Sequence, residues 1–163
     1  MLSERYSDFL QELKEEVIRF YGDNLVTLAI FGSVARGTMR LDSDIDLFIC
    51  ASNLPDGRWH RVDDFEVLES RLEPAFAALR QQGITPVLSP IIKTPAETEL
   101  GSVLFIDMTE DVIILFDKES YFRKYLDRLT AKMKALGSKK VMLGNAWYWI
   151  LIPDHTKVRE VSL

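Results

Sequence analysis

Two short apolar runs rich in strand-forming residues constrain the fold of this chain most strongly. They are NLVTLAIF (residues 24–31) and IDLFIC (45–50), and a polar segment that contains glycine joins them. Both are short and bounded by turn residues, which predicts strands. Before the first run, the apolar residues of 3–21 recur at spacings of three and four, which predicts an amphipathic helix. Alternating helices and strands of this kind build an α/β layer structure.

The same alternation continues along the chain. Helical periodicity returns over residues 61–82, and ITPVLSPII (84–92) is a third candidate strand. Since Pro86 and Pro90 cannot donate hydrogen bonds to a ladder, this strand is predicted to lie at a sheet edge or to be bulged.

The C-terminal half is less regular. Thr94-Pro95 predicts the start of another helix, because proline is favoured in the first turn. Residues 112–116 fit either a short strand or a continuation of the preceding packed segment. Residues 119–136 fit a helix that Gly137 ends.

Length and composition predict one domain. The chain has 163 residues, of which 47% are hydrophobic, and its formal charge is −5. A chain of this size buries roughly 70% of the surface that it exposes when unfolded, so it needs no disulfide or structural metal. We expect a single domain over residues 1–163, with a core over about 24–118, an appended C-terminal helix (119–136) and an aromatic tail (145–163).

Several classes of protein are excluded by the same figures. The acidic balance argues against extended nucleic acid as a partner, since phosphate neutralisation needs clustered Lys and Arg. The longest apolar run, 146–152, is far shorter than the ~18 residues of a membrane span, and the charged N-terminal segment does not resemble a secretory signal. The single cysteine, Cys50, allows no internal disulfide, so we expect a cytoplasmic protein.

Two aspartates stand at the entrance to the second predicted strand. Side chains alternate along a strand, so Asp44 and Asp46 are expected on one face with Cα atoms ~6–7 Å apart. Carboxylates this close repel each other, and a divalent cation such as Mg²⁺ relieves the repulsion. The pair is therefore a candidate Mg²⁺ site; the alternative is a solvated loop end.

A candidate phosphate-binding turn follows the first predicted strand. Gly32 permits close approach of a ligand, Ser33 adds a hydroxyl, and Arg36 lies one turn further on. Alone, Gly-Ser after a strand fits an ordinary turn. Together with the aspartate pair it predicts a nucleoside-triphosphate site.

The stretch GSVARGTMRLDSDIDL (32–47) resembles the signature of the minimal nucleotidyltransferases of the DNA polymerase beta superfamily, which is Gly-Ser, ten residues and Asp-x-Asp. The resemblance covers about residues 24–50, and the elements to about 118 follow the family order more loosely. It implies an α+β, polymerase beta palm-like fold with a small mixed sheet flanked by helices. It also implies that Gly32, Ser33 and Arg36 contact the phosphates and that Asp44 and Asp46 bind catalytic Mg²⁺.

This resemblance further implies an enzyme that moves a nucleoside monophosphate, AMP from ATP in the first instance, to a hydroxyl on a protein or small molecule. Many such proteins silence a HEPN-type toxin by attaching AMP to a tyrosine, so an antitoxin role is implied as well. The sequence does not fix the base preference, the acceptor or the oligomeric state.

One family feature is missing. The family's third carboxylate usually lies on the next core strand, but ITPVLSPII contains no acid, and Ser89 is the polar residue nearest its middle. Glu97, Glu99 and Asp107 are unranked candidates from the following helix. A second hypothesis therefore stays open, in which the fold persists as a nucleotide-binding or partner-binding module with weak or no catalysis.

The aromatic tail resembles that of a smaller group of archaeal and bacterial nucleotidyltransferases. Trp147-Tyr148-Trp149, Pro153-Asp154 and Lys157 match its pattern, whereas residues 158–160 depart from it. Two interpretations remain: the aromatic residues dock the tail onto the core, or they form a surface for a partner.

Overall fold

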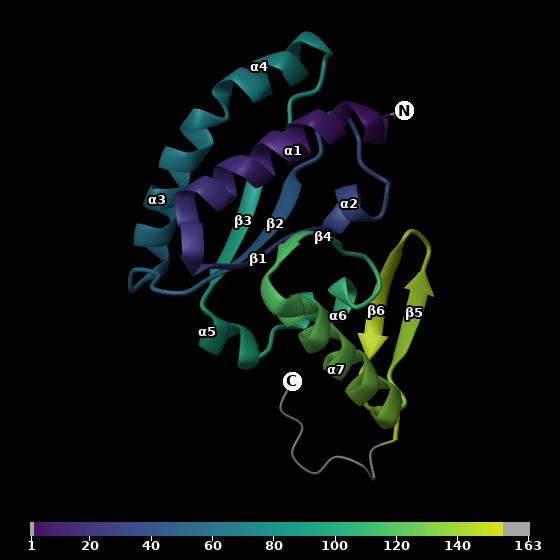
Figure 1. The fold of residues 1–163 in the computed structure, drawn as a ribbon. Coiled ribbons are helices and arrows are strands. Elements are labelled where there is room, and N and C mark those ends of the chain that lie inside the picture. The colour runs from purple at the N-terminus through teal and green to yellow at the C-terminus, as the bar shows by residue number, and fades with distance from the viewer. Residues whose placement is uncertain (1, 155–163) are drawn as a thin grey trace.

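The two apolar runs form adjacent strands at the centre of a four-stranded sheet. The computed structural model describes residues 2–154. Strand β1 (Leu25–Phe31) pairs antiparallel with β2 (Ile45–Ala51). Strand β3 (Leu88–Lys93) lies parallel to β2, and β4 (Ile113–Asp117) lies antiparallel to β1, which gives the order β3-β2-β1-β4 (Figure 1). The predicted mixed sheet is confirmed, as is the edge position of β3.

Helices cover both faces of this sheet (Figure 1). Leu47 and Ile49 of β2 pack in the core under α1, α3 and α4, whereas Phe48 and Cys50 pack in the core under α6 and α7. This division follows from the alternation of side chains along a strand. The helices are α1 (Leu2–Tyr21), α2 (Gly32–Ala35), α3 (Arg58–Arg71), α4 (Glu73–Gln81), α5 (Pro95–Glu99), α6 (Val103–Met108) and α7 (Tyr121–Leu136), with short 3₁₀ turns at Gly22–Asn24 and Lys118–Ser120.

The predicted boundaries need two corrections. The helix predicted over 61–82 is two helices, α3 and α4, which meet at Leu72. The third strand begins at Leu88 instead of residue 84, and residues 84–87 form a loop. That loop is hydrogen-bonded to the segment that leads into β2: the Thr85 N–H donates to Leu41 O, and the Ile45 N–H donates to Val87 O. Pro86, between them, has no N–H with which to extend the ladder.

The aromatic tail also differs from expectation, because it is half of a β-hairpin. Strand β5 (Lys139–Leu143) pairs antiparallel with β6 (Ala146–Ile150) through a turn at Gly144-Asn145, where Gly144 has φ +64°. Gly-Asn between two strand-forming runs is a hairpin signal. The hairpin lies beside α6 and α7 (Figure 1). The predicted tail residues 155–163, including Lys157, lie outside the described part of the chain.

An aromatic cluster packs against β2 at Phe48, near the middle of the strand. The Phe48 ring lies 4.5 Å from the Phe122 ring and 5.1 Å from the Phe105 ring, measured between centroids. All three side chains are almost fully buried. The cluster thereby anchors the strand two residues after Asp46. Within residues 2–154, no helix is both long and apolar enough to cross a membrane.

We expect Phe48→Ala to lower the free energy of unfolding by about 3–5 kcal/mol, because it leaves a cavity between two aromatic rings. Urea denaturation at constant m-value measures the loss. Val67→Ala is the control, since Val67 is 50% exposed on α3 and should cost within about 0.5 kcal/mol. A loss below about 1 kcal/mol for Phe48→Ala would show that this cluster does not anchor β2.

Candidate active site

The first feature of the site is the turn from β1 into the short helix α2. Gly32 has φ +70°, a conformation that favours glycine. Three backbone hydrogen bonds close the turn: the Arg36 N–H donates to Gly32 O, the Gly37 N–H to Val34 O and the Thr38 N–H to Ser33 O. A Cβ at Gly32 would overlap Asp46 Oδ2 and lie 3.0 Å from Asp46 Cγ. The Asp46 carboxylate therefore lies directly against the Gly-Ser turn.

The aspartate pair is held by the start of β2. Asp46 is opposite Phe31 of β1 and level with Ser89 of β3. It alternates with Leu47, so it shares its sheet face with Phe48 and faces the α6–α7 side. Asp46 is half-buried and Asp44 is exposed. Burial first, and then the charge of Asp44, raise the pKa of Asp46, while the Arg36 guanidinium lowers it.

The β5–β6 hairpin closes the side of the site next to Arg36. The Arg36 guanidinium carbon lies 4.9 Å from the centroid of the Trp147 ring. The indole N–H groups of Trp147 and Trp149 both donate to Asp107 Oδ1, at 2.9 and 2.8 Å. The docking interpretation of the tail is thus correct for these two tryptophans. Sequence reasoning missed the position of Trp147 beside Arg36, although the Gly144-Asn145 turn signal predicts the hairpin that brings it there.

Comparison with known proteins agrees with this geometry. The family model described as "Nucleotidyltransferase domain" matches residues 10–102, which include β1, α2 and β2. The chain belongs to this family. It is also 31% identical over 138 residues to "Putative protein adenylyltransferase MJ1305" of Methanocaldococcus jannaschii, a match that covers 83% of this chain and 86% of that protein. The sequence-based assignment to a nucleotidyltransferase family is confirmed, and the protein is a nucleotidyltransferase enzyme.

Solved structures are similar to this nucleotidyltransferase at lower identity. The structure of "a putative nucleotidyltransferase from Sulfolobus solfataricus" is 20% identical, with a TM-score of 0.46, over 71% of this chain and 86% of that one. A toxin-antitoxin crystal structure with AMP-PNP is 20% identical, with a TM-score of 0.43, over 75% of this chain and 93% of that one.

None of the three candidates for a third carboxylate stands beside Asp46 as a ligand. Glu97 pairs with Arg61, Glu99 with Arg128, and Asp107 with the two indoles. The neighbour of Asp46 on β3 is Ser89, which is exposed. In the described range 2–154, no cluster of three or more His, Cys, Asp or Glu side chains is arranged to hold a metal ion. The candidate site thus offers two carboxylates, Asp44 and Asp46.

Glu97 has a structural role instead. Its carboxylate accepts hydrogen bonds from Arg61 at 2.7 and 3.1 Å, and it completes the capping box of α5 with Thr94. The Arg61 hydrogen bond, helped by the Thr94 N–H, lowers the pKa of Glu97 to about 2, against the opposing effect of burial. Glu97 therefore joins α3 to the segment after β3.

The low pKa of Glu97 predicts an acid-labile contribution to stability. Since the folded-state pKa lies below the unfolded one, the contribution is complete above about pH 4.5 and is lost as the pH falls towards 2. Allowing for solvent screening, we expect Glu97→Gln to cost about 1–2 kcal/mol at pH 7 and much less at pH 3, by urea denaturation. Glu73→Gln, in an exposed pair with Arg80, is the control and should cost under about 1 kcal/mol. A Glu97→Gln cost independent of pH would contradict this account.

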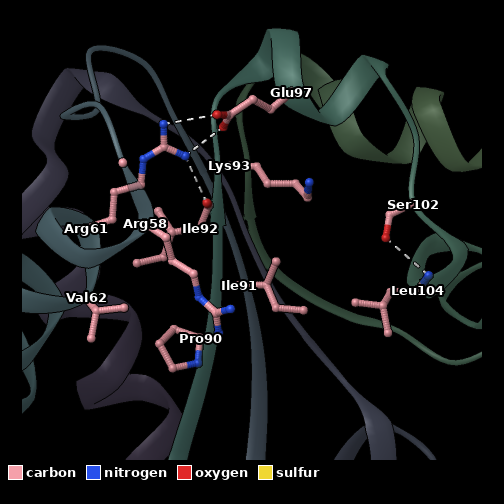
Figure 2. A pocket seen from close by; sticks show the side chains of 11 residues that line it. Arg58, Arg61, Val62, Pro90, Ile91, Ile92, Lys93, Glu97, Ser102 and Leu104 are labelled. Carbon is pink, nitrogen blue, oxygen red and sulfur yellow. Dashed lines mark hydrogen bonds and ion pairs between the residues drawn. The ribbon is translucent and has the colours of Figure 1, made fainter.

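A groove runs along the free edge of β3 (Figure 2). Its cavity of about 520 Å³ is bounded by α3 on one side and by the α5–α6 segment on the other. Ile91, one position beyond Ser89 on the same strand face, lies on its wall. Arg61 is occupied by Glu97 and by the carbonyl oxygens of Pro55 and Ile92. Arg58 and Lys93 form no ion pair with any residue in the described part of the chain, so the groove is basic.

Proposed function

We propose that this nucleotidyltransferase is Mg²⁺-dependent and transfers AMP from ATP to a hydroxyl group on a polypeptide. The observation that carries the proposal is the contact between the Gly32-Ser33 turn and the Asp46 carboxylate, which supports a phosphate site next to the aspartate pair. The name of the Methanocaldococcus jannaschii relative supports an adenylyl group as the one transferred.

The residues present fit Mg²⁺. Asp44 and Asp46 supply carboxylate oxygens, the ligands that this hard cation prefers. Burial of Asp46 beside the charge of Asp44 makes a bound cation favourable, because it offsets both the desolvation and the repulsion. When bound, Mg²⁺ would supply charge neutralisation for the phosphates and a lower pKa for an acceptor hydroxyl.

This chain's own groups would position the reactants. The Gly32-Ser33 turn would place backbone N–H groups and the Ser33 hydroxyl at the phosphates, and Arg36 would add cationic donors. The acceptor oxygen would bond to the α-phosphorus as the bond from that phosphorus to the bridging oxygen breaks. Pyrophosphate would leave, and the hydroxyl proton would pass to water or to a carboxylate. Positioning and charge stabilisation carry most of such a transfer.

Labelled ATP tests the reaction class. The protein is incubated with Mg²⁺, a Glu/Tyr copolymer as a model acceptor, and ATP labelled at either the α- or the γ-phosphate. We expect the α-label on the polymer and the γ-label in pyrophosphate. Transfer of the γ-label would indicate a kinase, and binding of ATP without transfer of either label would favour a binding module.

We place the acceptor in the basic groove beside β3. Ile91 lies on the wall of the groove, and Ser89 is the preceding residue on the same face of β3. Since Ser89 is level with Asp46, a polypeptide segment in the groove could present a hydroxyl to the aspartate pair. Arg58 and Lys93 would attract acidic residues around that hydroxyl.

Charge reversal tests this placement. We expect Lys93→Glu to lower transfer to the Glu/Tyr copolymer about fivefold and to leave the Kd for ATP unchanged. Lys124→Glu, at an exposed position of α7, is the matched control. Equal transfer by the two variants would contradict the placement of the acceptor in this groove.

We also propose a HEPN-type toxin as the natural acceptor, which would make this protein an antitoxin. Support comes from the motif over residues 32–47 and from its resemblance to the minimal nucleotidyltransferases. The test uses a purified HEPN-type toxin, taken from a small all-helical reading frame next to this gene where one is present. Adenylylation of that protein, with loss of its toxicity, is the expected result.

A second candidate function is a partner-binding module without catalysis. The observation that favours it is Ser89, which is level with Asp46 on the strand where the resemblance implies a third carboxylate. In that case the protein binds its partner equally well with and without ATP, and no label is transferred.

A further inference from the structure

The inner face of the β5–β6 hairpin forms a wall next to the Gly-Ser turn. Trp147 and Trp149 alternate with Tyr148 along β6, so both indoles point inward, while Tyr148 is 51% exposed. Trp149 packs against the α6–α7 core cluster, which attaches the hairpin to the body of the protein. Trp147 lies beyond it, with its ring under the Arg36 guanidinium.

Asp107 of α6 fixes the orientation of that ring. One oxygen, Oδ1, accepts from both indole N–H groups, which sets the two rings relative to α6. Lys140 of β5 lies 4.7 Å from the Trp147 centroid and forms an ion pair with Glu110. The Trp147 ring is therefore held from α6 and from the neighbouring strand, and only its contact with Arg36 faces the site.

The type of contact matters for the chemistry of Arg36. A carboxylate partner would use the N–H donors of the guanidinium and cancel its charge, whereas an aromatic face contacts the plane and leaves the donors available. Among residues 2–154, no acidic side chain forms an ion pair with Arg36. Arg36 directly follows α2, the helix that begins at Gly32 against Asp46, and its guanidinium contacts the hairpin at Trp147.

We propose that Trp147 is a positioning residue for the nucleotide: its indole face, oriented by Asp107, holds the Arg36 guanidinium towards the phosphate site with its hydrogen-bond donors open. This inference rests on the proposed function, because it assumes that Arg36 contacts phosphate. It assigns the C-terminal hairpin, which lies outside the matched family region 10–102, to the nucleotide site. It also gives Asp107 a role in orienting the indoles instead of binding metal.

A double-variant cycle tests the coupling. The Kd for MgATP is measured by calorimetry, and the KM and kcat for transfer are measured in parallel, for Trp147→Leu, Arg36→Ala and the double variant. We expect each single change to raise Kd and KM, Trp147→Leu by roughly threefold to thirtyfold, with less change in kcat. In the Arg36→Ala background, Trp147→Leu should add less than about twofold.

Two further variants separate positioning from folding. Trp147→Phe keeps an aromatic face but loses the N–H donor to Asp107, so its Kd should lie between those of the wild type and Trp147→Leu. Tyr148→Leu, on the outer face of the same strand, should leave Kd unchanged. Thermal unfolding checks that each variant is folded. Multiplicative effects of Trp147→Leu and Arg36→Ala, or a normal Kd in folded Trp147→Leu, would overturn the inference. If the wild type binds MgATP but transfers nothing, the proposed function fails while the binding cycle still decides the role of Trp147.

Discussion

Asp46→Asn and Asp44→Asn should each reduce nucleotidyl transfer by at least about 100-fold without destabilising the protein. Loss of either carboxylate would remove a Mg²⁺ ligand and with it much of the charge stabilisation at the phosphates. Stability should stay level or rise for Asp46→Asn, because the change removes a half-buried charge that stands beside Asp44. Labelled transfer and thermal unfolding without Mg²⁺ measure the two effects.

Asp42→Asn is the matched control for this pair. It removes the same charge from the exposed loop that also holds Asp44, but Asp42 stands outside the Asp44-x-Asp46 pair. We expect its transfer rate to stay within about twofold of the wild type. Equal losses in Asp42→Asn and Asp46→Asn would point to overall charge and away from a specific metal site.

Gly32→Ala should be almost as damaging to activity as loss of an aspartate. The new methyl group would overlap Asp46 Oδ2, and the backbone at φ +70° would be strained by any side chain. Because the turn and the carboxylate must both move, we expect transfer to fall about 100-fold. Transfer is measured under the same conditions as for the aspartate variants.

Gly83→Ala separates backbone strain from the clash with Asp46. Gly83 has φ +77°, and an added Cβ there has no neighbour within 4 Å. The positive φ should cost each variant about 1–2 kcal/mol of stability, and the clash should cost Gly32→Ala more, but Gly83→Ala should keep its activity. If Gly32→Ala and Gly83→Ala lower the transfer rate equally, the contact between Gly32 and Asp46 has no special importance for the reaction.

The sequence predicted the parts of this protein that local patterns encode. Apolar runs gave β1 and β2, and the spacing from Gly32-Ser33 to Asp44 and Asp46 gave the candidate site together with the family. The contact between Gly32 and Asp46 follows from the same elements, since Phe31 and Asp46 are opposite each other in an antiparallel pair.

The remaining features depend on which long-range partner each residue finds. The sequence offered no reason to prefer any one of three acids, Glu97, Glu99 and Asp107. Their partners depend on tertiary packing: Glu97 pairs with Arg61 of α3, Glu99 with Arg128 of α7, and Asp107 with two indoles of the hairpin. Trp147 and Arg36 are in contact although more than one hundred residues separate them in the sequence. No local periodicity carries that information.

The most direct measurement of the central claim is the anomalous scattering of Mn²⁺, used in place of Mg²⁺, in crystals grown with a non-hydrolysable ATP analogue. We expect a peak about 2.1 Å from carboxylate oxygens of both Asp44 and Asp46 and next to the analogue's phosphates, with the Gly32-Ser33 turn against those phosphates. A metal peak that contacts neither aspartate, or a nucleotide bound away from the turn, would contradict the account.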